Sequence, residues 1–333
     1  MADADSTPDS PRSRAGGTVL SLLAGPLCAP ILRAHLDGPL RLPDLRERIG
    51  GAAQTTLRGQ VGNLRAIGAL ERQVRSVMPY TVENELTDVG RGILAVADAV
   101  EAWLSRAPMG PIALGSEPAK GAIRALVAGW DSTVLRALSV RPLSLTELDS
   151  VIVDVSYPSL ERRLSAMRAA RQLELEPNAM GKSKPYSVTE WTRQAVGPLI
   201  AASRCERQHL PALTEPLGRI DVEAAFLLAV PLVSLDSDRS GSCLLAVSAL
   251  AGEASGGEAS RERVAGVQVE IERGEVVSCA PRPAEDPNTW TIGSAGAWIE
   301  TILDGGVENL EIGGSQKVLA KGLVNGLHRA LAV

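Results

Sequence analysis

Apolar side chains recur at helical spacing through the first seventy residues and predict three helices. The first stretch runs from Val19 to Leu36 and stops at the breaker formed by residues 37–39. Residues 42–49 then predict a helix of two turns, with a proline that the first turn tolerates. A third helix is expected over about 54–67, because its apolar side chains fall on one face and a glycine follows that can end it.

A β-hairpin and a further helix are predicted behind these three helices. Residues 70–74 and 80–86 are short runs of strand-forming side chains around a polar tip. Residues 87–91 open a last helix, whose apolar positions continue as far as Trp103. This order of elements is that of a winged helix-turn-helix, which presents its third helix to a DNA groove and its hairpin to phosphates.

The same pattern returns later in the chain at one constant offset. Residues 29–70 align without a gap with residues 132–173, and Ile31-Leu32-Arg33-Ala34 corresponds to Val134-Leu135-Arg136-Ala137. The period is far too long for a solenoid. We therefore predict two similar globular units in tandem, produced by duplication of a domain of about a hundred residues.

Local motifs in both copies resemble the HxlR-type transcriptional regulators. In the first copy the resemblance rests on Ile31-Leu32-Arg33, on the sequence GPLRLPDL at 38–45 and on LTDVGR at 86–91. In the second copy it rests on Gly129-Trp130 and on Pro185-Tyr186-Ser187-Val188-Thr189. The resemblance covers roughly residues 18–106 and 123–207. It implies DNA binding by winged helices that usually pair in a homodimer, a pair that two copies within one chain could supply.

The candidate DNA-contacting side chains lie on the third helix and the hairpin of each copy. Base readout in the major groove needs long polar side chains, and hairpin cations suit phosphates. Gly59 and Gly62 leave the outward face of the first copy bare, so a degenerate first copy that only pairs with the second is an open alternative. The candidates in the first copy are Gln54, Thr55, Arg58, Gln60, Asn63, Arg65 and Arg75. Those in the second copy are Ser156, Tyr157, Ser159, Arg162, Arg163, Arg168, Lys182 and Lys184.

Charge is distributed unevenly along the chain. Residues 18–106 hold ten arginines and no lysine against nine acidic residues, and residues 123–207 hold twelve basic against nine acidic residues. Neither copy is strongly basic, so DNA binding would have to rest on the local placement of cations. From residue 215 onward nine basic residues face seventeen acidic ones, and this last part is not expected to lie on DNA.

The pattern after residue 212 is that of a mixed α/β unit. Residues 224–230 are apolar, and residues 243–247 form a second apolar run that suits a buried strand. Residues 267–272 alternate as a half-buried strand that turns into a partner at 275–279. Residues 252–263, rich in Gly, Ser, Ala and Glu, predict a loop or an insert.

The end of the chain resembles sterol carrier protein type 2 domains. The resemblance rests on a strand over 290–292, a helix capped by Ser294, a strand over 307–312 and a final helix from Ser315 with Val318 on its apolar face. Gly313-Gly314 stand where the family often has Gly-Asp. The resemblance covers roughly residues 215–333 and implies an apolar cavity for fatty acyl chains or other lipophilic molecules. Aromatic side chains also fill ordinary cores, so the sequence alone does not separate a cavity from a core. The candidate ligand-binding residues are Phe226, Leu228, Leu245, Val267, Trp290 and Trp298.

Composition excludes several other classes. The chain of 333 residues is 45% hydrophobic, which is ample for three compact domains, and no run of 18 apolar residues predicts a membrane span. The polar residues 1–17 lack the apolar core of a signal peptide, so a disordered tail and a cytoplasmic location are expected. Four scattered cysteines have no metal-ligand spacing and are expected to be reduced thiols, with redox sensing as the minor alternative. No catalytic residue, metal or cofactor is predicted.

The sequence thus predicts an α+β chain with three domains. These are a tail over 1–17, a winged helix-turn-helix over 18–106, a linker over 107–122, a second winged helix-turn-helix over 123–210 and an α/β sterol-carrier-like domain over 215–333. The leading hypothesis is a transcriptional regulator that binds double-stranded DNA as a monomeric pseudo-dimer or a homodimer, controlled by a lipophilic small-molecule effector. The alternative is a ligand-binding or protein-interaction protein that keeps the winged-helix scaffold without binding DNA. A lipid-modifying enzyme is the weakest hypothesis, because no nucleophile or base can be named.

Overall fold

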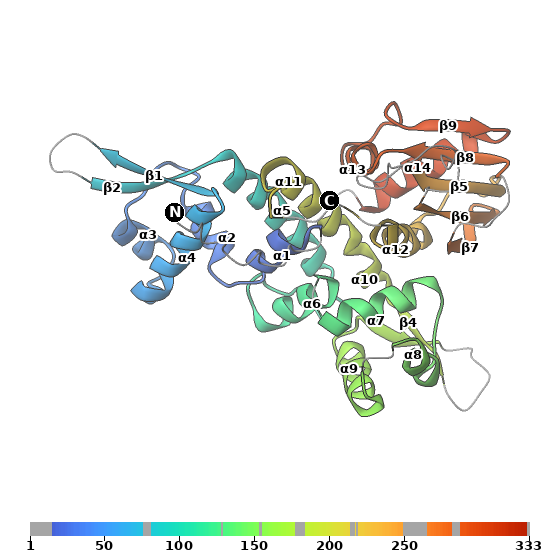
Figure 1. Ribbon diagram of the computed structural model, residues 1–333, viewed down its shortest axis with the longest axis horizontal. Coiled ribbons are helices and arrows are strands. Elements are labelled where there is room, and N and C mark those ends of the chain that lie inside the picture. Colours follow the sequence, from blue (N-terminus) through green and yellow to red (C-terminus); the bar gives the residue numbers. More distant parts are fainter. Residues whose placement is uncertain are drawn as a thin grey trace, which may run out of the picture.

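The computed structural model arranges the chain as three parts around two central helices (Figure 1). An N-terminal part (residues 15–105) and a middle part (117–209) are mainly helical, and a C-terminal part (219–331) contains a five-stranded sheet. The predicted loop at 252–263 and most of the predicted tail lie outside the described residues. The structure describes residues 15–75, 81–127, 129–152, 155–176, 184–213, 217, 219–248, 265–281 and 287–331.

The N-terminal part follows the order predicted from the hydrophobic pattern, with one correction. Its elements are α1 (Gly17–Leu23), α2 (Cys28–Ala34), α3 (Leu42–Arg48), α4 (Gln54–Ala66), β1 (Leu70–Arg75), β2 (Thr81–Leu86) and α5 (Asp88–Ser105). The apolar stretch from Val19 to Leu36 is two helices bent by 84°, not one, because Gly25-Pro26 interrupts it. Leu36 therefore lies beyond the end of α2 and is 56% exposed.

Thr87 and Gly90 fix the start of α5 against the hairpin. The Thr87 hydroxyl accepts a hydrogen bond from the Gly90 amide at 3.2 Å and donates one to the Gly68 carbonyl at 2.6 Å. A Cβ on Gly90 would lie 2.4 Å from the carbonyl oxygen of Ala69, so no other residue fits without movement of the backbone. The junction between the hairpin and the last helix is thus set by close packing as well as by a helix cap.

The middle part repeats this order of elements. They are α6 (Glu117–Val127), α7 (Gly129–Val140), α8 (Leu145–Val151), α9 (Tyr157–Ala169), β3 (Leu173–Leu175), β4 (Tyr186–Val188), α10 (Glu190–Gln194) and α11 (Val196–His209). Thr189 stands where Thr87 stands in the first part. Its hydroxyl donates to the Arg171 carbonyl at 2.8 Å and accepts from the Thr192 amide at 3.4 Å. The range 107–122, predicted as a linker, includes the first turns of α6, which packs against α1 and α7.

The C-terminal part is a sheet with the strand order β7-β6-β5-β8-β9, in which the pair β5–β8 is parallel and the other pairs are antiparallel. Its elements are α12 (Arg219–Ala229), the 3₁₀ turn η1 (Val230–Leu232), β5 (Gly241–Val247), β6 (Ala265–Glu272), β7 (Glu275–Pro281), β8 (Thr289–Gly293), α13 (Ala295–Asp304), β9 (Glu311–Gly314) and α14 (Lys317–Leu331). Helices α12 and α13 lie on the side of the sheet that faces the rest of the chain (Figure 1). They form most of the contact between this part and the middle part, where β7 also meets α7 and η1 meets α10.

Two predictions for the end of the chain were wrong in detail. The strand predicted over 307–312 begins only at Glu311, because Gly305 and Gly306 adopt φ of +80° and +83° and a turn follows that the Leu310 amide closes on the Val307 carbonyl at 3.1 Å. Val318, predicted on the apolar face of the last helix, is 62% exposed. The buried face of α14 is formed by Leu319, Leu323 and Leu327.

Buried apolar side chains do not follow the predicted domain limits. One cluster joins the N-terminal part to α6 and to Ala202 and Cys205 of α11. A second cluster joins α7, α8 and α9 to the C-terminal part and includes Val196 of α11. Helix α11 therefore contributes to both cores, and it also packs along α5.

Candidate nucleic-acid interface and apolar pocket

The outward face of α4 is polar and free of acidic side chains. Within α4, Leu57, Val61 and Leu64 are buried, and acidic residues are absent from its sequence. Beside them, Gly59 and Gly62 face open space: a Cβ added at either position would meet no other atom within 4 Å, so the middle of the helix is bare. Gln60 is half-buried, and the exposed candidates are Gln54, Thr55, Arg58, Asn63 and Arg65. The side chain of Arg75, at the end of β1, is outside the described side chains.

Helix α9 carries three arginines and one exposed acidic residue, Glu161, so its net charge equals that of α4. Leu160, Leu164 and Met167 face the core. The guanidinium of Arg162 donates to the Ser159 hydroxyl at 3.4 Å. Ser156, Tyr157, Arg162 and Arg168 are exposed, and Ser159 and Arg163 are half-buried. On the hairpin, Lys184 is exposed and Lys182 lies outside the described residues.

A groove of about 770 Å³ runs beside α9 and was not predicted from the sequence. Ser159, Arg162 and Arg163 line one wall, and residues 107–112 with Pro118 line the other. The segment predicted as a linker thus lies beside part of α9. Tyr157 and Arg168 do not line this groove, and they remain on the open surface of the helix.

The two polar helices lie in different parts of the molecule. In Figure 1, α4 lies at the left, below the β1–β2 hairpin, and α9 lies at the bottom of the view beside α8. Helices α5 and α11 lie between them and pack along each other.

Two buried contacts join the N-terminal and middle parts. The indoles of Trp103 and Trp191 stack with ring centroids 4.9 Å apart, and each donates a hydrogen bond to the other's carbonyl, at 2.8 and 3.0 Å. The fully buried carboxylate of Glu206 in α11 accepts hydrogen bonds from the Gly16 and Val19 amides, both at 2.7 Å, at the start of α1. Sequence reasoning missed both contacts, because the partners lie far apart in the chain.

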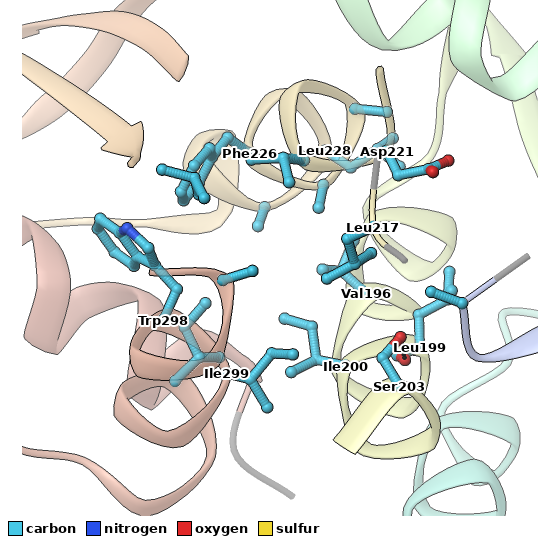
Figure 2. Close-up of a pocket in the computed structure, with 18 of the residues that line it drawn as sticks. Val196, Leu199, Ile200, Ser203, Leu217, Asp221, Phe226, Leu228, Trp298 and Ile299 are labelled. Atoms are coloured by element: carbon cyan, nitrogen blue, oxygen red, sulfur yellow. Dashed lines mark hydrogen bonds between the residues drawn. The ribbon is translucent and has the colours of Figure 1, made fainter. Parts of the chain in front are cut away.

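An apolar pocket of about 140 Å³ lies between the middle and C-terminal parts (Figure 2). Val196, Leu199 and Ile200 of α11 form one side, and Phe226 of α12 and Trp298 of α13 form the other. Phe226 and Trp298 meet edge to face with ring centroids 5.0 Å apart. The Trp298 indole is held by a hydrogen bond to the Ala246 carbonyl at 2.8 Å.

The predicted ligand-binding residues divide into two groups. Phe226, Leu228 and Trp298 line the pocket. Leu245 and Val267 are fully buried within the sheet, and neither lines the pocket. Trp290 is half-buried on β8, where its ring packs on Gly313. The pocket therefore lies among α11, α12 and α13 and reaches the sheet at Val247 of β5, not at the sheet positions that the sequence suggested.

Arginines of the middle part form ion pairs with acidic side chains of the C-terminal part. Arg204 contacts Glu300 at 3.2 Å and Asp304 at 2.8 Å, and Arg207 contacts Glu300 at 3.0 Å. The hydrogen bond from Arg204 lowers the pKa of Asp304 below its ordinary value. On the other side of the pocket Arg136 of α7 forms an ion pair with Asp221 of α12, so several acidic side chains of this part are used in docking.

The cysteines have the environment of structural thiols. Burial raises the pKa of Cys28, Cys243 and Cys279 to about 12 and that of Cys205 to about 11, so each remains a thiol at neutral pH.

Within the described part of the chain, no group of three or more His, Cys, Asp or Glu side chains is arranged to hold a metal ion. No single helix among the described residues is long and apolar enough to cross a membrane.

Comparison with known proteins relates the N-terminal part to a described type of domain. Residues 27–109 match the family model described as HxlR-like helix-turn-helix, so the N-terminal part carries a winged helix-turn-helix domain of this type. The match supports a DNA-binding transcriptional regulator as the class of the protein. Among solved structures, the reduced form of the transcriptional regulator YodB from B. subtilis is similar at 29% sequence identity, with a TM-score of 0.26, over 27% of this chain and 87% of that chain. No curated protein matches the chain.

Proposed function

We propose that the protein regulates transcription by binding double-stranded DNA through α4 and α9. The observation that carries this proposal is the HxlR-like match over 27–109, which includes α4 with its exposed polar side chains. Arg58 and Arg65 are positioned to contact phosphates or base edges, and the absence of acidic side chains from α4 removes a source of repulsion. The N-terminal part therefore acts as a DNA-binding module.

The middle part supplies a second winged helix, and the two form a pair within one chain. This proposal is supported by the repeated order of elements, by the Thr87 and Thr189 caps and by the packing of α5 along α11. In this proposal α4 and α9 contact one duplex, with half-sites about 34 Å apart or a multiple of that spacing. Their exposed side chains differ, so the preferred site is asymmetric.

The C-terminal part is a sterol-carrier-like unit that places DNA binding under the control of a lipophilic small molecule. The order of its last strands and helices and the apolar pocket at α12 and α13 support this role. A ligand changes DNA affinity only if it binds two arrangements of the chain with different affinity. Helix α11 contributes side chains to both hydrophobic cores, so it connects that pocket physically with the DNA-binding parts.

Selection from a random pool of duplex DNA tests the proposed function. The full chain is expected to enrich a defined sequence at about 150 mM salt, where affinity for nonspecific DNA is weak. Enrichment of no sequence, with only salt-sensitive binding to every duplex, overturns it.

The alternative function is ligand or protein binding on a winged-helix scaffold without DNA. The open space around Gly59 and Gly62 favours it, because the centre of α4 offers no side chain to a base edge. Replacing both Arg162 and Arg163 by alanine distinguishes DNA binding from this alternative function. A DNA affinity that is unchanged in this variant supports the alternative for α9, and a loss supports direct contact.

A further inference from the structure

The pocket between α11, α12 and α13 belongs to neither neighbouring part alone. Leu135 of α7 and Val196, Leu199 and Ile200 of α11 close one side. The other side comes from the C-terminal part, mainly from α12 and α13 (Figure 2). A molecule in this pocket would touch both parts at once, so its binding depends on how they are docked.

The polar side chains that line the pocket are already engaged. The Ser203 hydroxyl donates to the Leu199 carbonyl at 2.9 Å, and Arg136 is paired with Asp221. An ionic ligand would lose its hydration on entering the pocket and would gain no charged or hydrogen-bonding partner in return, which is costly in an apolar site. A neutral apolar ligand loses little on entering and gains contacts with Phe226 and Trp298.

The volume limits the size of the ligand. The pocket measures about 140 Å³, similar to an engineered apolar cavity of about 150 Å³ that stays dry and binds benzene. A long acyl chain does not fit this space in the present arrangement. Molecules of one or two rings, or short branched alkyl compounds, match it.

We propose that this interface pocket binds a small neutral hydrophobic molecule of one or two rings and that the bound molecule strengthens docking of the C-terminal part on α11. The effect on DNA rests on the proposed function, whereas the binding itself does not. Helix α11 is the connecting element because it lines the pocket, buries Glu206 against the start of α1 and carries Arg204 toward α13. Occupancy therefore restrains the helix on which the N-terminal and C-terminal parts both rest.

Thermal unfolding of the full chain with toluene as the probe tests the binding. Toluene at ten times its dissociation constant is expected to raise the Tm by about 2 °C, since it binds the folded state alone. Ala225→Phe, which fills the pocket from α12, is expected to abolish this rise. Ala280→Phe is the matched control, because the same change on the exposed side of β7 leaves the pocket open. No rise with the natural chain, or an equal rise with Ala225→Phe, overturns the proposal.

A second variant keeps the test decisive if Ala225→Phe does not fold. Ile200→Ala enlarges the pocket from α11 and is expected to bind naphthalene at least tenfold more tightly than the natural chain. An unchanged naphthalene affinity contradicts the assignment.

DNA affinity is then measured with and without toluene. Toluene binding without any DNA binding removes the proposed function and leaves the pocket assignment standing, whereas DNA binding without toluene binding removes the pocket assignment alone.

Discussion

The indole of Trp103 donates a hydrogen bond to the carbonyl of Trp191, and the indole of Trp191 donates one back to the carbonyl of Trp103. The rings stack at 4.9 Å with their planes 12° apart, and both side chains are buried. This reciprocal contact joins the end of α5 to α10, so it fixes the N-terminal part against the middle part. The relative placement of α4 and α9 depends on such contacts.

Replacing either tryptophan by phenylalanine is expected to destabilise the chain. Trp191→Phe removes one of two donors to the Trp103 carbonyl, which keeps the Arg106 amide at 3.1 Å, and the free energy of unfolding should fall by about 1 kcal/mol. Urea denaturation of Trp191→Phe, Trp103→Phe and the double variant measures the coupling between them, expected to exceed about 0.5 kcal/mol because the rings touch. Trp290→Phe, at a half-buried position outside this contact, is the control. Changes no larger than that of the control contradict the proposed role of the pair.

Single exposed arginines on α4 and α9 are expected to contribute to DNA affinity. Arg58→Ala, Arg65→Ala and Arg168→Ala should each weaken binding and reduce the slope of log affinity against log salt by about one if the side chain contacts a phosphate. Fluorescence anisotropy across a salt series measures both quantities. Arg239→Ala, in the C-terminal part, should change neither. An N-terminal part that does not touch DNA would show no effect at Arg58 and Arg65 together with a clear effect at Arg168.

Loss of Arg204 is expected to loosen the C-terminal part. Arg204→Ala removes the contacts with Glu300 and Asp304, and Arg204→Lys should restore part of them. Small-angle scattering should show a larger radius of gyration for Arg204→Ala than for Arg239→Ala. The lowered pKa of Asp304 means that the contact persists at neutral pH and is lost as the pH falls through that lowered value. Identical scattering curves for the two variants at pH 7 would show that contacts other than those of Arg204 are enough to keep the C-terminal part docked.

His35 is expected to make the chain less stable in mild acid. Burial lowers its pKa below the ordinary 6.5, and its Nδ1 lies 2.7 Å from the Ile31 carbonyl while Nε2 is buried without a partner. The unfolded chain therefore binds the proton more readily, so this contribution to stability is present above pH 6.5 and is lost as the pH falls through the lowered pKa. Urea denaturation between pH 8 and pH 5 measures it. His35→Gln should show a shallower decline over this range, and equal declines would contradict the assignment.

The local elements could be predicted from the sequence much better than their assembly. Leu57, Val61 and Leu64 marked α4, and Thr87 with Gly90 marked the start of α5, because periodicity and capping act over a few residues. The contacts of Trp103 with Trp191 and of Glu206 with the start of α1 join residues far apart in the chain, and no local pattern reports them.

The apolar pocket shows the same limit. Phe226 and Trp298 were expected to bind a ligand from their apolar character, and they do line the pocket. Leu245 and Val267 have the same character but are packed within the sheet. Ile200 and Leu199 went unnoticed, because they belong to a helix of the middle part that reaches the pocket only through docking. Residue type alone does not separate a wall of a pocket from a core.

The intramolecular pair of winged helices is tested by selecting DNA with the purified full chain, footprinting the enriched site and determining the mass of the complex by native mass spectrometry. We expect one chain per duplex on an asymmetric site, with two protected regions separated by about one or more helical turns. Two chains on a palindromic site, with protection attributable to a single winged helix from each chain, would contradict the intramolecular pair.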